Sequence, residues 1–196
     1  LYAKTLMHNK QYTTADKLLA TLNIIPFEGA TIGHELYREA KLMQALVQLQ
    51  EKNYTAALNF INEAKLWPEN LGAGKPYDED IDIRTENWLA YLCYKNLNNA
   101  KAANEMLLAV VNFMPIRSNT ISNFYAGNHL ISLWAYAALN QSSQGAEWIK
   151  KQQAKFLDNK IMQWASSSYQ QKKVQPIAIQ SEDATVRIIK QLSLTK

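Results

Sequence analysis

The sequence predicts an all-α fold, an α-solenoid of three to four helical hairpins closed by a C-terminal helical cap. Three observations favour it. Apolar residues recur at spacings of three and four along most of the chain, which is the period of an amphipathic helix. Only 6 Gly and 5 Pro occur in 196 residues, so the elements should be few and long. A pattern of aromatic and small residues also returns at a fixed interval, which indicates an internal repeat.

The first hairpin is predicted to end at Pro26, because proline cannot continue a helix. Helical patterns over 2–6 and 12–22 are separated by a polar break at 8–11. Thr13, with Asp16 three residues later, has the spacing of a capping box. In that motif the two side chains satisfy free N–H groups at the start of a helix.

The second hairpin repeats this plan 42 residues later. A long helix over 36–49 is followed by a break at 52–53, a second helix over 54–64 and a stop at a proline. Three marker positions share the 42-residue offset, and they are Tyr12 and Tyr54, Ala15 and Ala57, and Pro26 and Pro68. Agreement at three positions indicates that the two hairpins are copies of one unit.

Two more hairpins and a cap are predicted from the same helical spacing. The third hairpin runs from Trp88 to Pro115 with its turn at 97–99, and a fourth, degenerate one covers 119–157. The cap is expected to contain two helices joined by an extended stretch at Pro176, and these helices cover 160–172 and 181–192. We therefore expect helical repeats over 1–157, with an inserted loop near 69–82, and capping helices over 158–196.

The motif aromatic-x-x-Ala, followed by proline at the end of the unit, resembles the tetratricopeptide repeat, a helix–turn–helix of about 34 residues. Tyr12-x-x-Ala15 and Tyr54-x-x-Ala57 match it, Ala100-x-x-Ala103 matches it in part, and Gly145 is only suggestive. The resemblance implies stacked hairpins whose first helices line a concave groove. Loops at 27–33 and 69–82 make the period longer than in the family.

A second resemblance rests on the segment Trp-Pro-Glu-Asn-Leu-Gly-Ala-Gly-Lys-Pro-Tyr-Asp at 67–78, together with Pro-Phe-Glu-Gly at 26–29. These residues resemble the C-terminal repeat region of large bacterial proteins that carry a galactose-mutarotase-like β-sandwich upstream. The resemblance implies a solenoid attached to a carbohydrate-related domain, and it supplies no catalytic residue. Because the helical pattern is already under way at Leu1, we expect the chain to be a fragment of a longer protein.

Composition narrows the classes of function. A 47% apolar and 19% charged chain is typical of a folded protein. The net charge of +4 is mild and the four arginines are scattered, which argues against a nucleic-acid partner. No apolar run approaches the roughly 18 residues of a membrane span. The single cysteine, Cys93, is expected to be a buried thiol, and neither compartment nor oligomeric state follows from the sequence.

Three segments begin like known catalytic or metal-binding motifs and then depart from them. Gly72–Lys75 lacks the first glycine and the Ser/Thr of a phosphate loop, so we interpret Gly72 as a left-handed helix end. Asp78-x-Asp80-x-Asp82 lacks the glycine and glutamate of a calcium loop, and its acidic residues are expected to cap the next helix. His34-Glu35 lacks the second histidine of a zinc-protease helix.

We therefore expect a non-catalytic interaction module without cofactor or metal. It would bind a peptide, a helix or a neighbouring domain of its parent chain in the concave groove. The predicted partner-binding residues lie on the first helices and in the long loop, and they are Glu39, Leu42, Leu46, Gln50, Lys75, Trp88, Leu92 and Lys95. Two alternatives stay open. The first is an accessory carbohydrate-binding module with an exposed tryptophan platform, although most of the five tryptophans are expected in the core, and the second is an unrecognised enzyme.

Overall fold

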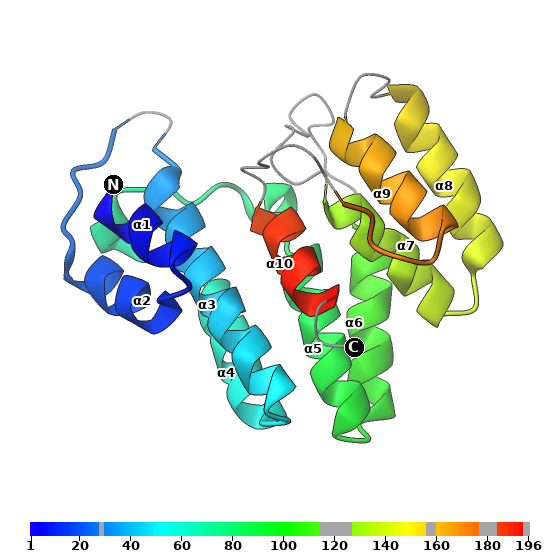
Figure 1. Ribbon diagram of the computed structural model, residues 1–196, viewed down its shortest axis with the longest axis horizontal. Helices are drawn as coiled ribbons and strands as arrows, with labels where there is room; N and C mark the ends of the chain where they lie inside the picture. The colour runs from blue at the N-terminus through cyan, green and yellow to red at the C-terminus, as the bar shows by residue number, and fades with distance from the viewer. Residues whose placement is uncertain (28–29, 114–126, 156–159, 177–183, 194–196) are drawn as a thin grey trace. The chain divides into compact units, whose positions relative to one another are not determined.

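The computed structural model describes residues 1–27, 30–113, 127–155, 160–176 and 184–193 (Figure 1). All regular elements in these ranges are helical, and no strand occurs among them. The predicted all-α class is therefore confirmed. The chain divides into two compact units, Leu1–Asp78 and Glu79–Lys196, which are described separately.

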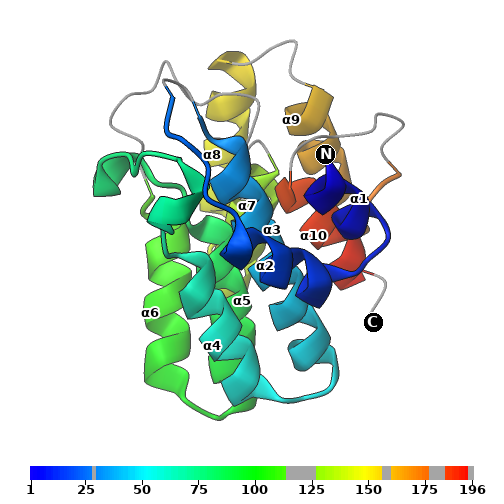
Figure 2. The same cartoon turned by 90° about the vertical axis from the view of Figure 1, so that its left-hand side faces the viewer.

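Within its described residues, the first unit contains four α-helices and one short 3-10 helix. They are α1 (Tyr2–His8), α2 (Tyr12–Thr21), α3 (Ile32–Gln50), α4 (Tyr54–Ala64) and η1 (Glu69–Leu71). The longest helix, α3, packs most extensively against α4 and also contacts α2 and α1 (Figure 2). Most of its buried residues run from Tyr37 to Leu46 with one interruption at Lys41, so α3 forms the centre of this unit.

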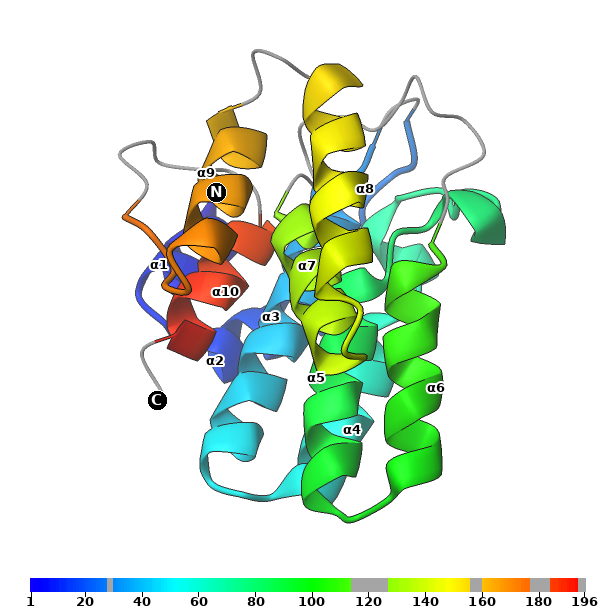
Figure 3. The same cartoon turned by 90° about the vertical axis from the view of Figure 1, so that its right-hand side faces the viewer.

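The described part of the second unit contains six α-helices. They are α5 (Arg84–Asn96), α6 (Ala100–Val111), α7 (Asn128–Ala138), α8 (Ser142–Lys155), α9 (Lys160–Gln170) and α10 (Ala184–Ser193). The short helix η2 (Asp78–Asp80) lies at the boundary between the units. Helix α7 contacts α5, α6, α8 and α9 and so occupies the middle of this unit (Figure 3).

One turn geometry joins four successive pairs of helices. Lys10, Lys52, Asn98 and Asn140 each adopt a left-handed conformation, with φ between 57° and 63°. In the first turn the N–H of Gln11 donates to the Leu6 carbonyl (2.9 Å) and that of Lys10 donates to the Met7 carbonyl (3.0 Å). The same two bonds recur in the other three turns, and together they form the Schellman motif that ends many helices.

A small residue follows each of these turns at the same position. Ala15, Ala57, Ala103 and Gly145 donate their backbone N–H to the last residue of the turn before them. All four are buried. A Cβ added at Gly145 would lie 2.9 Å from the Cβ of Tyr136, so α8 approaches α7 too closely for a larger residue. The turn thus places the fourth hairpin in the register of the first three.

The predicted capping box at Thr13 and Asp16 is wrong. The start of α2 has no side-chain capping bond. The Thr13 hydroxyl donates to Oε1 of Gln44 (3.1 Å), and Asp16 accepts from Nζ of Lys41 (2.7 Å), so both side chains bind α3. Partners on the neighbouring helix have replaced the local interaction that the sequence pattern suggested.

The first part of the long loop is fixed to α2. The side-chain amide of Asn70 donates to the carbonyls of Leu19 (3.0 Å) and Leu22 (2.8 Å), which satisfies the C-terminal end of that helix. Gly72 ends η1 in a left-handed conformation (φ 67°), and a Cβ there would lie 2.7 Å from the Ile24 carbonyl oxygen. The structural interpretation of Gly72 is confirmed.

Some predicted boundaries fall outside the described residues. The expected end of the third hairpin at Pro115, and the start of the fourth at 119, belong to the range 114–126. The expected domain boundary at 157/158 lies within 156–159. Within the described ranges, 174–176 is non-helical, as predicted next to a proline.

Candidate partner-binding surfaces

The predicted binding residues of the first unit lie on α3 and are mostly buried. Glu39 keeps 4% of its surface exposed, and Leu42 and Leu46 keep 0% and 1%. Gln50, the last residue of the helix, is exposed. Glu39, Leu42 and Leu46 therefore do not lie on an open surface in this structure, and their binding role stays a prediction.

Lys75 belongs to the exposed part of the long loop. Its Nζ lies 2.7 Å from a carboxylate oxygen of Asp78, three residues later, and both side chains are well exposed. A surface ion pair of this kind contributes at most about 1 kcal/mol. Lys75 is thus accessible to a partner, and the pair would cost little to break.

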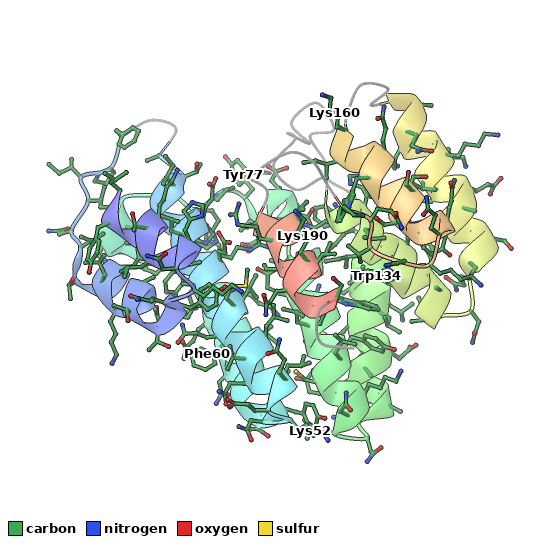
Figure 4. The ribbon with its side chains drawn as sticks, in the orientation of Figure 1. Lys52, Phe60, Tyr77, Trp134, Lys160 and Lys190 are labelled. Atoms are coloured by element: carbon green, nitrogen blue, oxygen red, sulfur yellow. The ribbon has the colours of Figure 1, made fainter. Side chains whose placement is uncertain are left out.

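Two of the predicted residues of the second unit, Trp88 and Lys95, lie at one aromatic cluster, which consists of Trp88 and Tyr91 of α5 and Trp134 of α7. The third, Leu92, is half-buried. The Trp88 ring lies 5.0 Å from that of Tyr91 and 5.6 Å from that of Trp134, measured between centroids. Figure 4 marks Trp134 on α7. Nζ of Lys95 lies 5.8 Å from the centre of the Tyr91 ring, a cation–π distance, so Lys95 borders the cluster.

Trp88 carries a buried hydrogen-bond donor. The side chain keeps only 9% of its surface exposed, and its Nε1–H has no acceptor among the residues that the structure describes. Leaving a buried donor unsatisfied costs about 1–3 kcal/mol, and most native structures avoid it. An acceptor from a bound molecule would remove this cost.

Trp134 was missed as a site residue, although the sequence contains a signal for it. Leu46 and Leu92 each lie six positions before the left-handed residue of their hairpin turn, Lys52 and Asn98. Trp134 lies six positions before Asn140, the equivalent residue of the fourth hairpin. Counting back from the turn residue aligns Trp134 with Leu46 and Leu92. The weak match of the repeat motif around Gly145 hides this alignment in the sequence.

A buried ion pair lies at the start of α5. The Asp82 carboxylate accepts from Nε (2.9 Å) and Nη2 (2.7 Å) of Arg84, and also from the Arg84 backbone N–H (3.1 Å). Nη1 of Arg84 donates to the Ser132 hydroxyl of α7 (2.9 Å). Burial alone would raise the pKa of Asp82, but the Arg84 charge and its hydrogen bonds hold that pKa below its usual value. The Asp82 carboxylate thus accepts from the first N–H of α5 and, through Arg84, joins α5 to α7. The N-cap residue is Ile83, which makes no side-chain capping bond, so the predicted capping by the acidic residues is met only by this one contact.

Three helices begin next to this ion pair. The Thr85 hydroxyl near the start of α5 donates to Oδ1 of Asn128, the first residue of α7 (2.6 Å). The Thr185 hydroxyl near the start of α10 lies 3.2 Å from that of Thr85 and 3.4 Å from Oδ1 of Asn128. All three residues are fully buried. We call Thr85, Asn128 and Thr185 the threonine–asparagine junction.

The first unit has a polar network that ties its helices together. Nζ of Lys41 on α3 lies 2.7 Å from Asp16 of α2 and 2.6 Å from Glu63 of α4. Burial would lower the pKa of Lys41, but hydrogen bonds and charges from the two carboxylates raise it overall. The Tyr37 hydroxyl donates to the Glu63 carbonyl (3.0 Å). The network joins three helices, which is a structural role.

Two buried titratable side chains, Cys93 and His34, have shifted pKa values. Burial raises the pKa of the Cys93 thiol to about 11, so the nucleophilic thiolate is scarce at neutral pH. His34 stacks on Trp67 with ring centroids 3.4 Å apart, and burial lowers its pKa to about 4. Among the described residues, no three His, Cys, Asp or Glu side chains gather in a way that could hold a metal ion. Over the same ranges, no helix has the length and apolarity of a membrane span.

Comparison with known proteins finds no match. No protein-family model fits the chain, and no curated protein or solved structure is significantly similar to it.

Proposed function

We propose that the chain is a non-catalytic interaction module built from tetratricopeptide-like hairpins that stack as a solenoid. The recurrent turn with a left-handed residue, followed by a small residue at the helix crossing, supports this relationship among the four hairpins. Hairpins of this class cannot bury their apolar faces alone and stack on their neighbours. The first helices of successive hairpins then form the face that receives a partner.

The observation that carries the proposal is the aromatic cluster with its unsatisfied donor. Trp88 and Trp134 stand together on α5 and α7, the first helices of two successive hairpins. Aromatic side chains dominate binding energy at protein interfaces. A peptide carbonyl would accept from the Trp88 indole N–H once binding moves the side chains that now bury this nitrogen. The partner is therefore a protein or peptide, and a neighbouring domain of the parent chain qualifies.

A carbohydrate partner is the alternative that the same cluster supports. Trp134 is half-buried, so part of its ring is open to a stacking sugar, and a sugar hydroxyl could accept from the Trp88 indole. This alternative uses the same residues, so binding assays with both kinds of ligand separate the two.

Affinity capture with the full chain as bait tests the proposal. We compare wild type with Trp134→Ala and with Lys95→Glu, which alter the cluster and its border. Lys101→Glu is the matched control, because Lys101 is an exposed lysine on α6. We expect a defined protein captured by wild type and by Lys101→Glu to be depleted at least about tenfold with the two cluster variants, equivalent to about 1.4 kcal/mol.

A glycan panel probed with the same four proteins completes the experiment. Binding to a glycan that depends on Trp134, without any protein whose capture depends on Trp134, would replace the proposal by the carbohydrate alternative. Capture that is equal for all four proteins would contradict the proposed surface.

A further inference from the structure

The C-terminal helix α10 lies on the face that the first helices of the second unit form. Figures 1 and 3 show α10 beside the N-terminal ends of α5 and α7. Thr185 reaches both helices through the threonine–asparagine junction, at 3.2 Å from Thr85 and 3.4 Å from Asn128. The chain therefore places a helix of its own on the face to which we assign partner binding.

The first turn of α10 packs closely against Gly127, just before α7, because glycine has no side chain. A Cβ added at Gly127 would lie 3.1 Å from the Cβ of Thr185 and 3.2 Å from Cγ2 of Val186. This spacing is tighter than most Cβ contacts, so a larger residue at 127 would displace the first turn of α10. The fit of α10 to the α5/α7 face is thus specific at its first turn.

One side of α10 is buried, and its first turn makes the contacts with the starts of α5 and α7. Thr185, Val186, Ile188 and Ile189 are buried and follow the three-to-four spacing of one helix face. Arg187 and Lys190 interrupt and follow these residues in the sequence, and both are half-buried. The helix observed here is therefore basic and amphipathic, and its buried side consists of the β-branched residues threonine, valine and isoleucine. Amphipathic helices seated in grooves by such a stripe are a common mode of recognition.

Another helix could displace α10 from the α5/α7 face. The helix has 10 residues, which is shorter than the roughly 12–15 that isolated helices need in water, so its helical state depends on the surface beneath it. Its bonds at the junction are between neutral side chains, and most of its attachment comes from the burial of Val186, Ile188 and Ile189. A second helix with the same apolar stripe would offer the same contacts.

We propose that α10 is an intramolecular ligand of the α5/α7 face, and that the protein partner binds by inserting an amphipathic helix with a β-branched stripe in place of α10. This inference rests on the proposed function, because it names the form of the partner and the step that regulates access to it. In the resting chain α10 occupies the face, and binding requires its release.

Two variants of the full chain set the state of α10. In the locked chain, Thr85→Cys with Thr185→Cys is oxidised to a disulfide by an added thiol oxidant. The hydroxyl oxygens that the two sulfurs replace are 3.2 Å apart, so a small rotation of the side chains brings the sulfurs to the bond length of about 2.05 Å. In the released chain, Val186→Asp with Ile189→Asp places two carboxylates on the buried stripe. The probe is a fluorescein-labelled synthetic peptide with the sequence of residues 181–196, and its control is the same peptide carrying both Asp substitutions.

We expect the released chain to bind the probe at least about tenfold more tightly than wild type, which corresponds to α10 occupying the face roughly 90% of the time. The oxidised locked chain should not bind it, a reducing agent should restore wild-type binding, and the control peptide should not bind any chain. Equal binding to all three chains would overturn the inference. A released chain that fails to bind, or that loses its cooperative unfolding transition, would also overturn it, because α10 would then be an integral core helix.

The captured partner separates this inference from the proposed function. If a partner depends on Trp134 but binds the oxidised locked chain as well as the reduced one, the function stands and the displacement of α10 is wrong. If the probe exchanges with α10 but no protein is captured, the displacement of α10 stands and the proposed function is wrong.

Discussion

His34 is an imidazole kept neutral by its surroundings. It lies near the start of α3, stacks on Trp67 and keeps 5% of its surface exposed. Its pKa is lowered to about 4, chiefly by burial and also by the positive charge of Arg38, while a hydrogen bond to the backbone of Leu66 acts in the opposite direction. The folded state thus binds a proton at this site less readily than the unfolded chain does.

This difference predicts a loss of stability in mild acid. Because the unfolded histidine has a pKa near 6.5, the unfolded state takes up the proton first, and the free energy of unfolding falls as the pH drops from about 6.5 to 4. We expect a loss of about 2 kcal/mol between pH 7.5 and pH 5, measured by urea unfolding. His34→Phe keeps a ring for the stack and removes the proton, so its stability should change less over the same range. An equal pH dependence in both proteins would refute the assignment to His34.

Two neighbouring glycines in the long loop are expected to respond in opposite ways to the same change. Gly72→Ala should lower the free energy of unfolding by about 1–3 kcal/mol, because the residue has φ 67° and its new Cβ would lie 2.7 Å from the Ile24 carbonyl oxygen. Gly74→Ala is the control, since nothing lies within 4 Å of a Cβ there. Thermal unfolding of the two variants checks this. If Gly72→Ala is as stable as Gly74→Ala, the loop is not held as described.

The hairpin turns are the clearest feature at the scale of secondary-structure elements. Each places a non-glycine residue in the left-handed conformation, at Lys10, Lys52, Asn98 and Asn140. This conformation costs a residue with a Cβ roughly 1 kcal/mol, and glycine avoids that cost. The turns therefore store a small strain that substitution can release.

Lys52→Gly tests this directly. We expect it to raise the free energy of unfolding by about 0.5–1 kcal/mol, because glycine fits the left-handed position at the C-terminal end of α3. Lys52→Ala should change stability little, since alanine removes the lysine side chain but still has a Cβ. Figure 4 marks Lys52 at this turn, between α3 and α4. Chemical denaturation of the two variants measures the difference, and equal stabilities would show that the conformation carries no such cost.

Much of the helical layout could be predicted because spacing and prolines are local signals. The second helix of the second hairpin, expected over 54–64, matches α4, and the helix expected over 160–172 matches α9 to within two residues. The capping box failed because Gln44 and Lys41, which are distant in sequence, took the side chains of Thr13 and Asp16. A motif of a few neighbouring residues does not indicate which distant residues will bind its side chains.

The candidate site was predicted less well, for a physical reason. Periodicity showed that Leu42 and Leu46 share one face of a helix, but it did not show whether that face is covered, and both are buried. On α5 the prediction found Trp88 and Lys95, whereas their neighbour Trp134 comes from another hairpin. The position of α10 on α5 and α7 depends on Thr85, Asn128 and Thr185, three short polar residues that form no sequence motif.

At the scale of the whole molecule, the chain is two compact units joined at Asp78 and Glu79. The first unit has eight basic and eight acidic residues, so the formal net charge of +4 belongs entirely to the second. Residues 74–79, beside the boundary, are all exposed. The second unit also contains the aromatic cluster and α10, which concentrates the proposed binding function there.

Cutting the chain near this boundary should leave both units helical. We propose inserting a specific protease site after Gly74, where the loop is exposed and open around the glycine. After complete cleavage, the far-UV circular dichroism should stay within about 10% of the intact value, because each unit has its own hydrophobic core. A large loss of helical signal on cleavage would mean that the units do not hold their helices separately.

The central claim is that α5 and α7 receive a partner, and hydrogen exchange of the full chain with and without the captured protein tests it most directly. We predict slower exchange in α5 (Arg84–Asn96) and α7 (Asn128–Ala138), and no change in α6 or α8. Faster exchange in α10 at the same time would support its displacement. Protection confined to α6 and α8, or to the loop around Lys75, would contradict the claim that the first helices form the binding face.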